Sequence, residues 1–281
     1  MLAIFTTFKP FTDPHIRTIQ RNALQSWIRL SPSCQVLLGG NEEGVKELCN
    51  EFRVIQVEDI SRNSHGLPLF RSLLSSAEHV ARFPYLCYVN GDIIFLDDFV
   101  QALQSVIETY NNFLVVGRRW DLEITSPLMY SNDWQEKLRF LVREKGTLHG
   151  ASGIDFLVFP KGILKDIPPL VVGRGGWDNW MIFYARRHRI PVIDITKVST
   201  VIHQNHDIQG TREKAKRFID ESAQANMKFA GGPRNLFTIR DADWVLNEQG
   251  FYKKFFSFLS LWYPWRLLIS WKRKISQHLK W

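Results

Sequence analysis

Residues 85–95 read YLCYVNGDIIF, and this stretch decides how the rest of the chain is interpreted. The apolar residues before Asn90 are typical of a buried strand, yet Asn90, Gly91 and Asp92 interrupt the run before it becomes apolar again. A carboxylate between two apolar runs needs a partner, such as a helix N-terminus, an arginine or a metal ion that carries a phosphorylated ligand. Alternatively, the three residues only form a turn, because Asn, Gly and Asp are common turn formers.

Short apolar runs alternate with helical patterns along the chain. The predicted strands are residues 2–7, 35–38, 53–57, 85–90, 113–116, 155–159 and 192–195. Asp13-Pro14 predicts the start of one helix, Asp97 or Asp98 is expected to cap another, and residues 177–187 form a third. This alternation predicts an α/β fold with a mostly parallel central sheet flanked by helices, and with ligands bound at the carboxyl ends of the strands.

Composition and charge limit the class of protein. The chain has 281 residues, of which 45% are hydrophobic, enough for one large α/β domain. A net charge of +8 favours an anionic partner, but no RNA-binding or helix-turn-helix signature points to nucleic acid. Three scattered cysteines, no signal-peptide pattern and no apolar run of about 18 residues predict a reduced, cytoplasmic protein without a spanning helix.

The composition changes after Gly250, so we expect two parts. Residues 1–250 form the α/β domain, and residues 251–281 form a helical tail that mixes aromatic residues such as Trp262 with basic ones such as Arg266. This mixture suits a segment that lies in the headgroup region at the inner face of a membrane. The alternative is a C-terminal helix that closes the core or forms a dimer. A charged amphipathic pattern at residues 210–235 predicts a helix that is either a lid or simply solvated.

Two further segments carry candidate chemistry. In GRGGWDNW, residues 173–180, Asp178 lies beside two tryptophans, so it could deprotonate the hydroxyl of a sugar stacked on them. Alternatively, Asp178 caps the helix and the tryptophans belong to the core. In VIHQNHD, residues 201–207, His203 or His206 could complete the coordination of an ion held by Asp92, or be structural.

Together these motifs resemble the nucleotide-sugar glycosyltransferases of the GT-A fold, in particular family-2-like enzymes of bacterial cell-envelope glycan synthesis. The motifs that carry the resemblance are FTTFKPF (5–11), Asn90-Gly91-Asp92, SGIDFLVFPKG (152–162), GRGGWDNW and VIHQNHD, in that order. The resemblance extends from about Leu2 to Asp207. It implies a hexosyltransferase-like, inverting enzyme that uses Mn²⁺ or Mg²⁺ to move a sugar from a nucleotide diphosphate to an acceptor hydroxyl.

The resemblance also implies roles for single residues. The family holds its metal with an Asp-any-Asp motif. Here Asn90 replaces the first acid, so Asp92 is the expected ligand, with His206 as first and His203 as second choice for the histidine. Asp178 matches the catalytic base. The expected nucleotide or donor contacts are Thr6, Thr7, Asn90, Gly91, Asp92, Gly153, Asp155, Gly176 and Trp177, with Ser152 beside them.

The implied partners are a nucleotide-diphosphate sugar and an acceptor glycan or lipid-linked sugar, with a membrane surface as a further partner of the tail. Arg118 and Arg119 are either diphosphate or acceptor contacts or plain surface charge. Two rival functions stay open. A sugar-nucleotide nucleotidyltransferase usually carries a glycine-rich basic loop where this chain has TTFKPFTDPH at 6–15. A non-catalytic membrane-surface binding protein would explain the tail but not GRGGWDNW.

Overall fold

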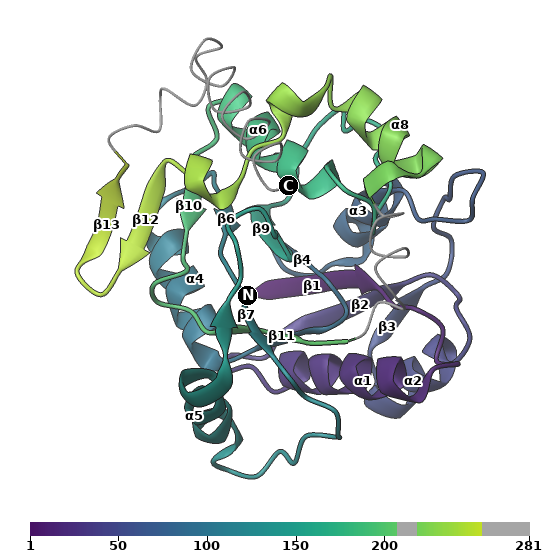
Figure 1. Ribbon diagram of the computed structural model, residues 1–281, viewed down its shortest axis with the longest axis vertical. Helices are drawn as coiled ribbons and strands as arrows, with labels where there is room; N and C mark the ends of the chain where they lie inside the picture. The colour runs from purple at the N-terminus through teal and green to yellow at the C-terminus, as the bar shows by residue number, and fades with distance from the viewer. Residues whose placement is uncertain (207–217, 255–281) are drawn as a thin grey trace, which may run out of the picture.

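A nine-stranded sheet forms the centre of the computed structural model, which describes residues 1–206 and 218–254 (Figure 1). Its strands, in spatial order, are β13 (Gly250–Lys253), β12 (Trp244–Asn247), β10 (Val192–Asp194), β6 (Leu114–Val116), β9 (Phe156–Pro160), β4 (Tyr85–Val89), β1 (Leu2–Thr7), β2 (Gln35–Gly39) and β3 (Ile55–Val57). Neighbours run parallel except that β9 is antiparallel to β4 and β6, and β13 to β12. The mostly parallel sheet is therefore confirmed, with one reversed strand inside it.

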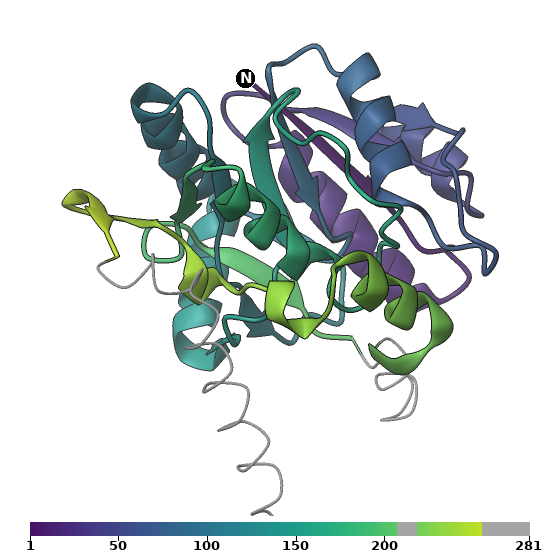
Figure 2. The same ribbon diagram turned by 90° about the horizontal axis from the view of Figure 1, so that it is seen from above.

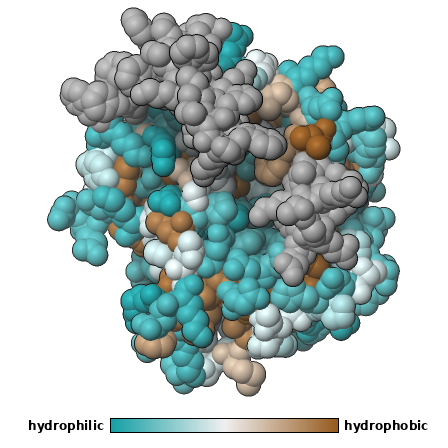
Figure 3. All heavy atoms as spheres, viewed as in Figure 1, coloured by the Kyte–Doolittle hydropathy of each residue, from teal (hydrophilic) through white to brown (hydrophobic). Residues whose placement is uncertain are grey.

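Helices cover both faces of this sheet, as the view from above shows (Figure 2). Side chains alternate along a strand, so Ala3 and Phe5 of β1 face one core while Leu2 and Ile4 face the other. The first core is completed by α3 (Phe70–Val80) and α6 (Trp177–Arg187), and the second by α1 (Pro14–Ile28), α2 (Val45–Phe52) and α4 (Asp97–Thr109). The described part of the face in Figure 3 is mostly hydrophilic, in keeping with apolar residues buried in these cores.

A second, four-stranded sheet lies beside the first and was not predicted. Its order is β5 (Ile93–Phe95), β11 (Val201–Gln204), β7 (Trp120–Leu122) and β8 (Thr147–Leu148). It packs with α5 (Trp134–Lys145) around a small core that includes Ile94, Leu138 and Ile202. The apolar run after Asp92 is therefore β5, the edge strand of this small sheet.

The predicted start of α1 has the expected cap, whereas that of α4 does not. Asp13 caps α1 as predicted, because its Oδ1 accepts hydrogen bonds from the backbone N–H of His15 at 2.7 Å and of Ile16 at 3.1 Å. The predicted cap of α4 is wrong, because Leu96 occupies that position. Asp98 instead accepts a hydrogen bond at 3.0 Å from the N–H of Thr200, just before β11, and so anchors the small sheet.

The C-terminal part of the described chain adds α8 (Glu221–Phe229), the short 3₁₀ turns η1 (Pro233–Asn235) and η2 (Ile239–Asp241), and the edge hairpin β12–β13. The helix expected within residues 210–235 is present as α8, while residues 207–217 lie outside the described residues. The first residues of the predicted tail form β13, and residues 255–281 also lie outside the described chain. The described helices include no segment with the length and hydrophobicity of a membrane span.

Candidate active site

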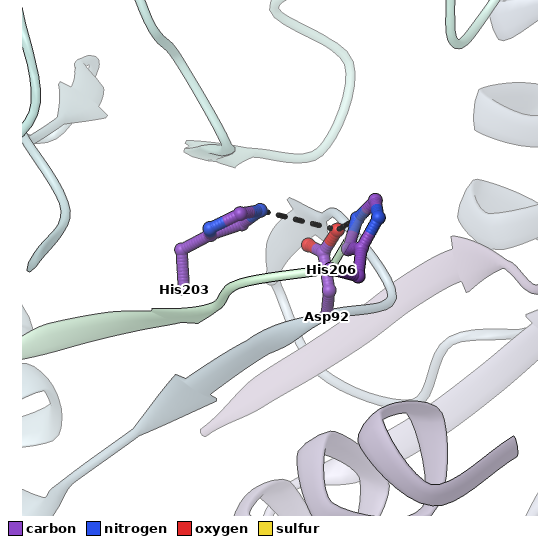
Figure 4. A group of neighbouring side chains, drawn as sticks. All are labelled: Asp92, His203 and His206. Carbon is purple, nitrogen blue, oxygen red and sulfur yellow. Dashed lines mark hydrogen bonds and ion pairs between the residues drawn. The ribbon is translucent and has the colours of Figure 1, made fainter. Parts of the chain in front are cut away.

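Asp92, His203 and His206 come together at the carboxyl end of β4, and both imidazoles point toward the same carboxylate (Figure 4). Nε2 of His206 lies 3.0 Å and Nε2 of His203 lies 3.5 Å from Asp92 Oδ2. Within the described chain Asp92 Oδ1 is buried without a hydrogen-bond partner. One carboxylate and two imidazoles with potential ligand atoms within 4.8 Å of one another form a donor set that suits a divalent cation, and the unpartnered oxygen is a further ligand atom for such an ion. The sequence predicted these three residues as metal ligands.

The small sheet brings these side chains together. β5 begins directly after Asp92 and pairs with β11 so that Ile93 lies opposite His203. The backbone oxygen of Asp92 accepts hydrogen bonds from Gln204, at 3.2 Å from its N and 3.1 Å from its Nε2. Gly91 must lack a side chain, because a Cβ there would lie 2.8 Å from the ring of Phe8.

Charge interactions stabilise this cluster without a metal ion. Burial disfavours the Asp92 carboxylate, but attraction by His203 and hydrogen bonds with both histidines outweigh burial and hold the pKa of Asp92 well below its usual value. Burial likewise opposes the charge of His203, yet the Asp92 carboxylate raises the pKa of His203 above its usual value. A metal ion therefore competes with a proton for His203.

The Asn90 side chain bonds to neighbours other than the three ligands, so its expected part in binding the donor stays a prediction. Its Nδ2 donates to Asp155 Oδ1 at 2.9 Å, and its Oδ1 accepts from the hydroxyl of Tyr88 at 3.0 Å. Arg119 donates to the same Asp155 oxygen. Asp155 is only 4% exposed, and its other oxygen has no hydrogen-bond partner among the described residues. Asn90 therefore supports Asp155.

Asp178 lies in the first turn of α6, one residue after the start of the helix. The N-cap is Gly176, whose φ of 93° favours glycine, so Asp178 is not the cap. Burial raises the pKa of Asp178 to about 7, with an added contribution from the nearby charge of Asp155, against the opposing hydrogen bond from the N–H of Asn179. A carboxyl group with this pKa can accept a proton near neutral pH.

The tryptophans on either side of Asp178 are core residues. Trp177 is 4% exposed, and its ring centroid lies 4.8 Å from the ring centroids of both Phe70 and Tyr88. Trp180 packs against Tyr184. Because its ring is enclosed by these neighbours, Trp177 is not available for sugar stacking, and the expectation of a donor contact through its ring is corrected.

The other predicted contacts lie at strand ends and in turns. Thr6 is fully buried near the end of β1, while Thr7 is half-buried at that end. Gly153 is required by packing, since a Cβ there would lie 2.5 Å from Cδ2 of His149. No contact links these residues to Asp92 among those described here, so their roles stay predictions.

Asp121 and His149 were missed by the sequence analysis, whereas Arg119 was expected as a diphosphate or acceptor contact or as surface charge. Asp121 Oδ1 lies 3.2 Å from Nδ1 of His203 and 2.9 Å from Nε of Arg119, and its Oδ2 lies 2.6 Å from Nδ1 of His149. Arg118 instead holds the backbone oxygen of His149 through its Nε at 2.6 Å. Both arginines are therefore committed to internal contacts, and the alternative of plain surface charge is wrong. The sequence signal for Asp121 was its place two residues after the arginine pair Arg118-Arg119, and His149 had none.

No protein-family model and no curated protein sequence matches this chain. Among solved structures, the chain is similar to glucosyl-3-phosphoglycerate synthase from Mycobacterium tuberculosis in complex with Mn²⁺, uridine diphosphate and phosphoglyceric acid. The TM-score is 0.51 at 13% identity, over 83% of this chain and 79% of that chain. A second structure of that synthase gives a TM-score of 0.51 at 14% identity, over 83% and 81%. The chain has the GT-A fold of nucleotide-sugar glycosyltransferases. S. aureus TarS 1-349 matches at 0.48 and 10% identity, over 80% and 74%.

The GT-A fold accounts for the position of the candidate site. In the central sheet, Asn90-Gly91-Asp92 directly follow the carboxyl end of β4. Ligands of open α/β sheets bind at such carboxyl ends. The antiparallel β9 places Asp155, just before its first residue, next to that end of β4, where the N–H of Asn90 donates to the backbone oxygen of Asp155 at 2.8 Å. In this GT-A chain the candidate cation ligands and the buried acid Asp155 therefore share one edge of the sheet.

Proposed function

We propose that this protein is a glycosyltransferase that moves a sugar from a nucleotide diphosphate to an acceptor hydroxyl. The observation that carries the proposal is the cluster of Asp92, His203 and His206 at the carboxyl end of β4. A raised carboxyl pKa at Asp178 supports it, and so does the GT-A fold. The similar synthase structure contains Mn²⁺ and uridine diphosphate, which favours a divalent cation and a nucleotide donor here.

Asp92, His203 and His206 would hold Mn²⁺ or Mg²⁺, and such an ion, when bound, neutralises negative charge on a diphosphate. Thr7 and Gly91 are the proposed contacts with the nucleotide at the ends of β1 and β4, and the fully buried Thr6 is proposed to support them from the core. Gly153 and Gly176 are proposed to let the donor approach the backbone closely. The buried unpartnered oxygen of Asp155 is available to accept a hydrogen bond from a sugar hydroxyl.

Asp178 is the proposed catalytic base. With a pKa of about 7, a large fraction of the group is ionised at neutral pH, and the ionised form can remove the proton of an acceptor hydroxyl. Attack by that hydroxyl on the anomeric carbon, opposite the departing diphosphate, would invert the configuration there. We propose this inverting reaction with a hexose donor.

The proposed acceptor is a glycan or a lipid-linked sugar of cell-envelope polysaccharide or glycolipid synthesis, reached at the inner face of the membrane through the tail after Lys254. The aromatic and basic sequence of residues 255–281 supports this setting. Two observations argue against the rival functions. The loop after β1 contains no glycine, unlike that of most nucleotidyltransferases, and a plain membrane-binding module would not need the Asp92 cluster.

Calorimetry with a panel of nucleotide sugars, with and without Mn²⁺, tests the proposal. We expect wild-type protein to bind one donor only when Mn²⁺ is present. Asp92→Ala should abolish this binding, whereas Asp178→Asn should keep donor binding and lose transfer. Asp133→Asn, which changes an exposed acid at the N-cap of α5, serves as the control and should behave as wild type. A folded wild-type protein that binds no nucleotide sugar would overturn the proposal.

A further inference from the structure

The small sheet aligns four polar side chains across neighbouring strands. Asp92 comes directly before β5, His203 is in β11, Asp121 is in β7, and His149 follows β8. β11 and β7 pair so that His203 and Asp121 lie directly opposite each other. The pairing of β7 with β8 brings the N–H of His149 to 2.9 Å from the backbone oxygen of Arg119. Register therefore fixes the order carboxylate, imidazole, carboxylate, imidazole.

His203 lies between the two carboxylates with one ring nitrogen facing each. Its Nε2 faces Asp92 at 3.5 Å, and its Nδ1 lies 3.2 Å from Asp121 Oδ1. The Nδ1 contact is close enough for an ion pair but is not aligned as a hydrogen bond, and within the described chain this buried nitrogen has no other hydrogen-bond partner. Hydrogen bonds in ligand-free sites are often misaligned and improve when the ligand binds.

We propose that Asp121 is the positioning residue of the metal site. It accepts a hydrogen bond from Nδ1–H of His203 and so leaves the Nε2 lone pair directed at the cation beside Asp92. Which ring nitrogen carries the proton is set by the hydrogen bond of the other nitrogen, and carboxylates commonly play this part for metal-bound histidines. The inference rests on the metal site of the proposed function and adds a residue that contacts no predicted substrate.

Arg119 and His149 hold Asp121 in place. Nε of Arg119 donates to Asp121 Oδ1 at 2.9 Å, and the same guanidinium donates to Asp155 through Nη1. Nδ1 of His149 lies 2.6 Å from Asp121 Oδ2. With both oxygens held, the carboxylate cannot rotate freely away from His203. Arg119 thus joins the metal side of the site to the buried acid Asp155.

Two variants separate positioning from general support of the sheet. Asp121→Ala removes the contact with His203. Asp98→Asn is the matched control, because Asp98 anchors the start of β11 through the N–H of Thr200 yet does not touch His203. The side chains of Asp98 and Asp121 are similarly buried, at 19% and 23% exposure. Circular dichroism and thermal unfolding first establish that each variant is folded, and Asp121→Asn provides a milder change should Asp121→Ala fail to fold.

Two measurements on these proteins do not depend on transfer activity. Nitrogen NMR at a pH where His203 is neutral should show the Nδ1–H form in metal-free wild type and in Asp98→Asn, and a shift toward the Nε2–H form in Asp121→Ala. Titration with Mn²⁺ alone should show about 10–100-fold weaker binding for Asp121→Ala, an intermediate loss for Asp121→Asn, and wild-type affinity for Asp98→Asn.

An unchanged His203 tautomer in Asp121→Ala, or equal Mn²⁺ affinity in Asp121→Ala and wild type, would overturn the positioning role even if the protein transfers sugar. Wild type that binds no Mn²⁺ overturns the metal site itself and this inference with it. If instead both measurements agree with expectation but no nucleotide sugar binds, the positioning role stands and the proposed function fails.

Discussion

At the scale of single residues, the contacts of Asn90 explain why an amide stands where the family's metal-binding motif has its first acid. Both polar atoms of its side chain are satisfied, by the Tyr88 hydroxyl and by the Asp155 carboxylate. An amide suits this place because it can donate to one neighbour and accept from the other. A carboxylate could not donate to Asp155 and would repel it.

We therefore expect Asn90→Asp to lower stability without improving metal binding. Loss of the donated hydrogen bond and a second charge beside Asp155 should cost about 1–3 kcal/mol of unfolding free energy. Urea unfolding at neutral pH measures the loss, with the exposed Asn41→Asp as control. A variant as stable as wild type that binds Mn²⁺ more tightly would show that position 90 still serves as a metal ligand.

Asp178 gives a prediction with a defined sign. Its pKa rises from an ordinary value of 3.8 to about 7 in the folded protein, so between these values the folded state holds a proton that the unfolded state has lost. Folding is thus favoured at low pH, and Asp178 makes the protein less stable as the pH rises from about 4 to about 7. The asparagine variant carries no such proton.

Without divalent ions, Asp178→Asn should accordingly be more stable than wild type at about pH 8, by an order of 1–3 kcal/mol. The two proteins should converge at about pH 4. Urea unfolding at both pH values, with the exposed Asp59→Asn as control, measures the difference. A constant difference between variant and wild type at all pH values would contradict a raised pKa of Asp178.

At the scale of elements, the sequence predicted the strands and helices of the large sheet better than those of the small sheet. The predicted strands 2–7, 85–90 and 113–116 match β1, β4 and β6 to within a residue, and the helix at 177–187 matches α6. Continuous apolar runs of buried strands and a clear helical period made these elements visible. The reversed direction of β9 was not visible, because direction leaves no mark in an apolar run.

The small sheet escaped prediction because β5 and β7 have three residues each and β8 has two, which is too short for an alternating pattern. The same limit explains the site. Asp92, His203, His206 and Asp178 were predicted because each belongs to a motif, whereas Asp121 meets His203, and His149 meets Asp121, only through strand register. Contacts between residues distant in sequence depend on tertiary pairing that no local pattern encodes.

The side chain of Gln204 links the small sheet to helix α1 by hydrogen bonds. This buried side chain accepts from Asn22 Nδ2 at 3.0 Å and donates to the backbone oxygens of Ile19 and Asp92, at 2.8 Å and 3.1 Å. Gln204→Leu would leave all three groups without this partner. We expect a loss of about 2–4 kcal/mol in stability together with weaker Mn²⁺ binding.

Urea unfolding and Mn²⁺ titration measure both effects, and Gln101→Ala on the exposed face of α4 provides the control. If Gln204→Leu were destabilised but bound Mn²⁺ as wild type does, the tie between α1 and β11 would support the fold without shaping the metal site.

At the scale of the whole molecule, the boundary between domain and tail depends on β13. Phe251–Lys253 pair with β12, and Lys254 donates from Nζ to the backbone oxygen of Ile239 at 3.1 Å. The sheet therefore includes the first residues of the aromatic and basic segment. Removing residues 255–281 takes away Arg266, Lys272, Arg273, Lys274 and Lys280 but no acidic residue, so the net charge falls from +8 to +3.

A chain that ends at Lys254 should therefore keep the thermal stability and donor binding of the full chain but lose sedimentation with vesicles that contain phosphatidylglycerol. The physical reason is that interfacial tryptophans and cations supply the proposed attraction to anionic lipid, and that attraction should also weaken with added salt. A chain that ends at Asn247 is the matched comparison, because it also removes β13 and exposes β12 as an edge. It should unfold at a temperature lower by about 2–4 °C or more. Retained vesicle binding by the chain ending at Lys254 would rule out the tail as the membrane contact and leave the basic surface of the GT-A domain as the remaining source of attraction.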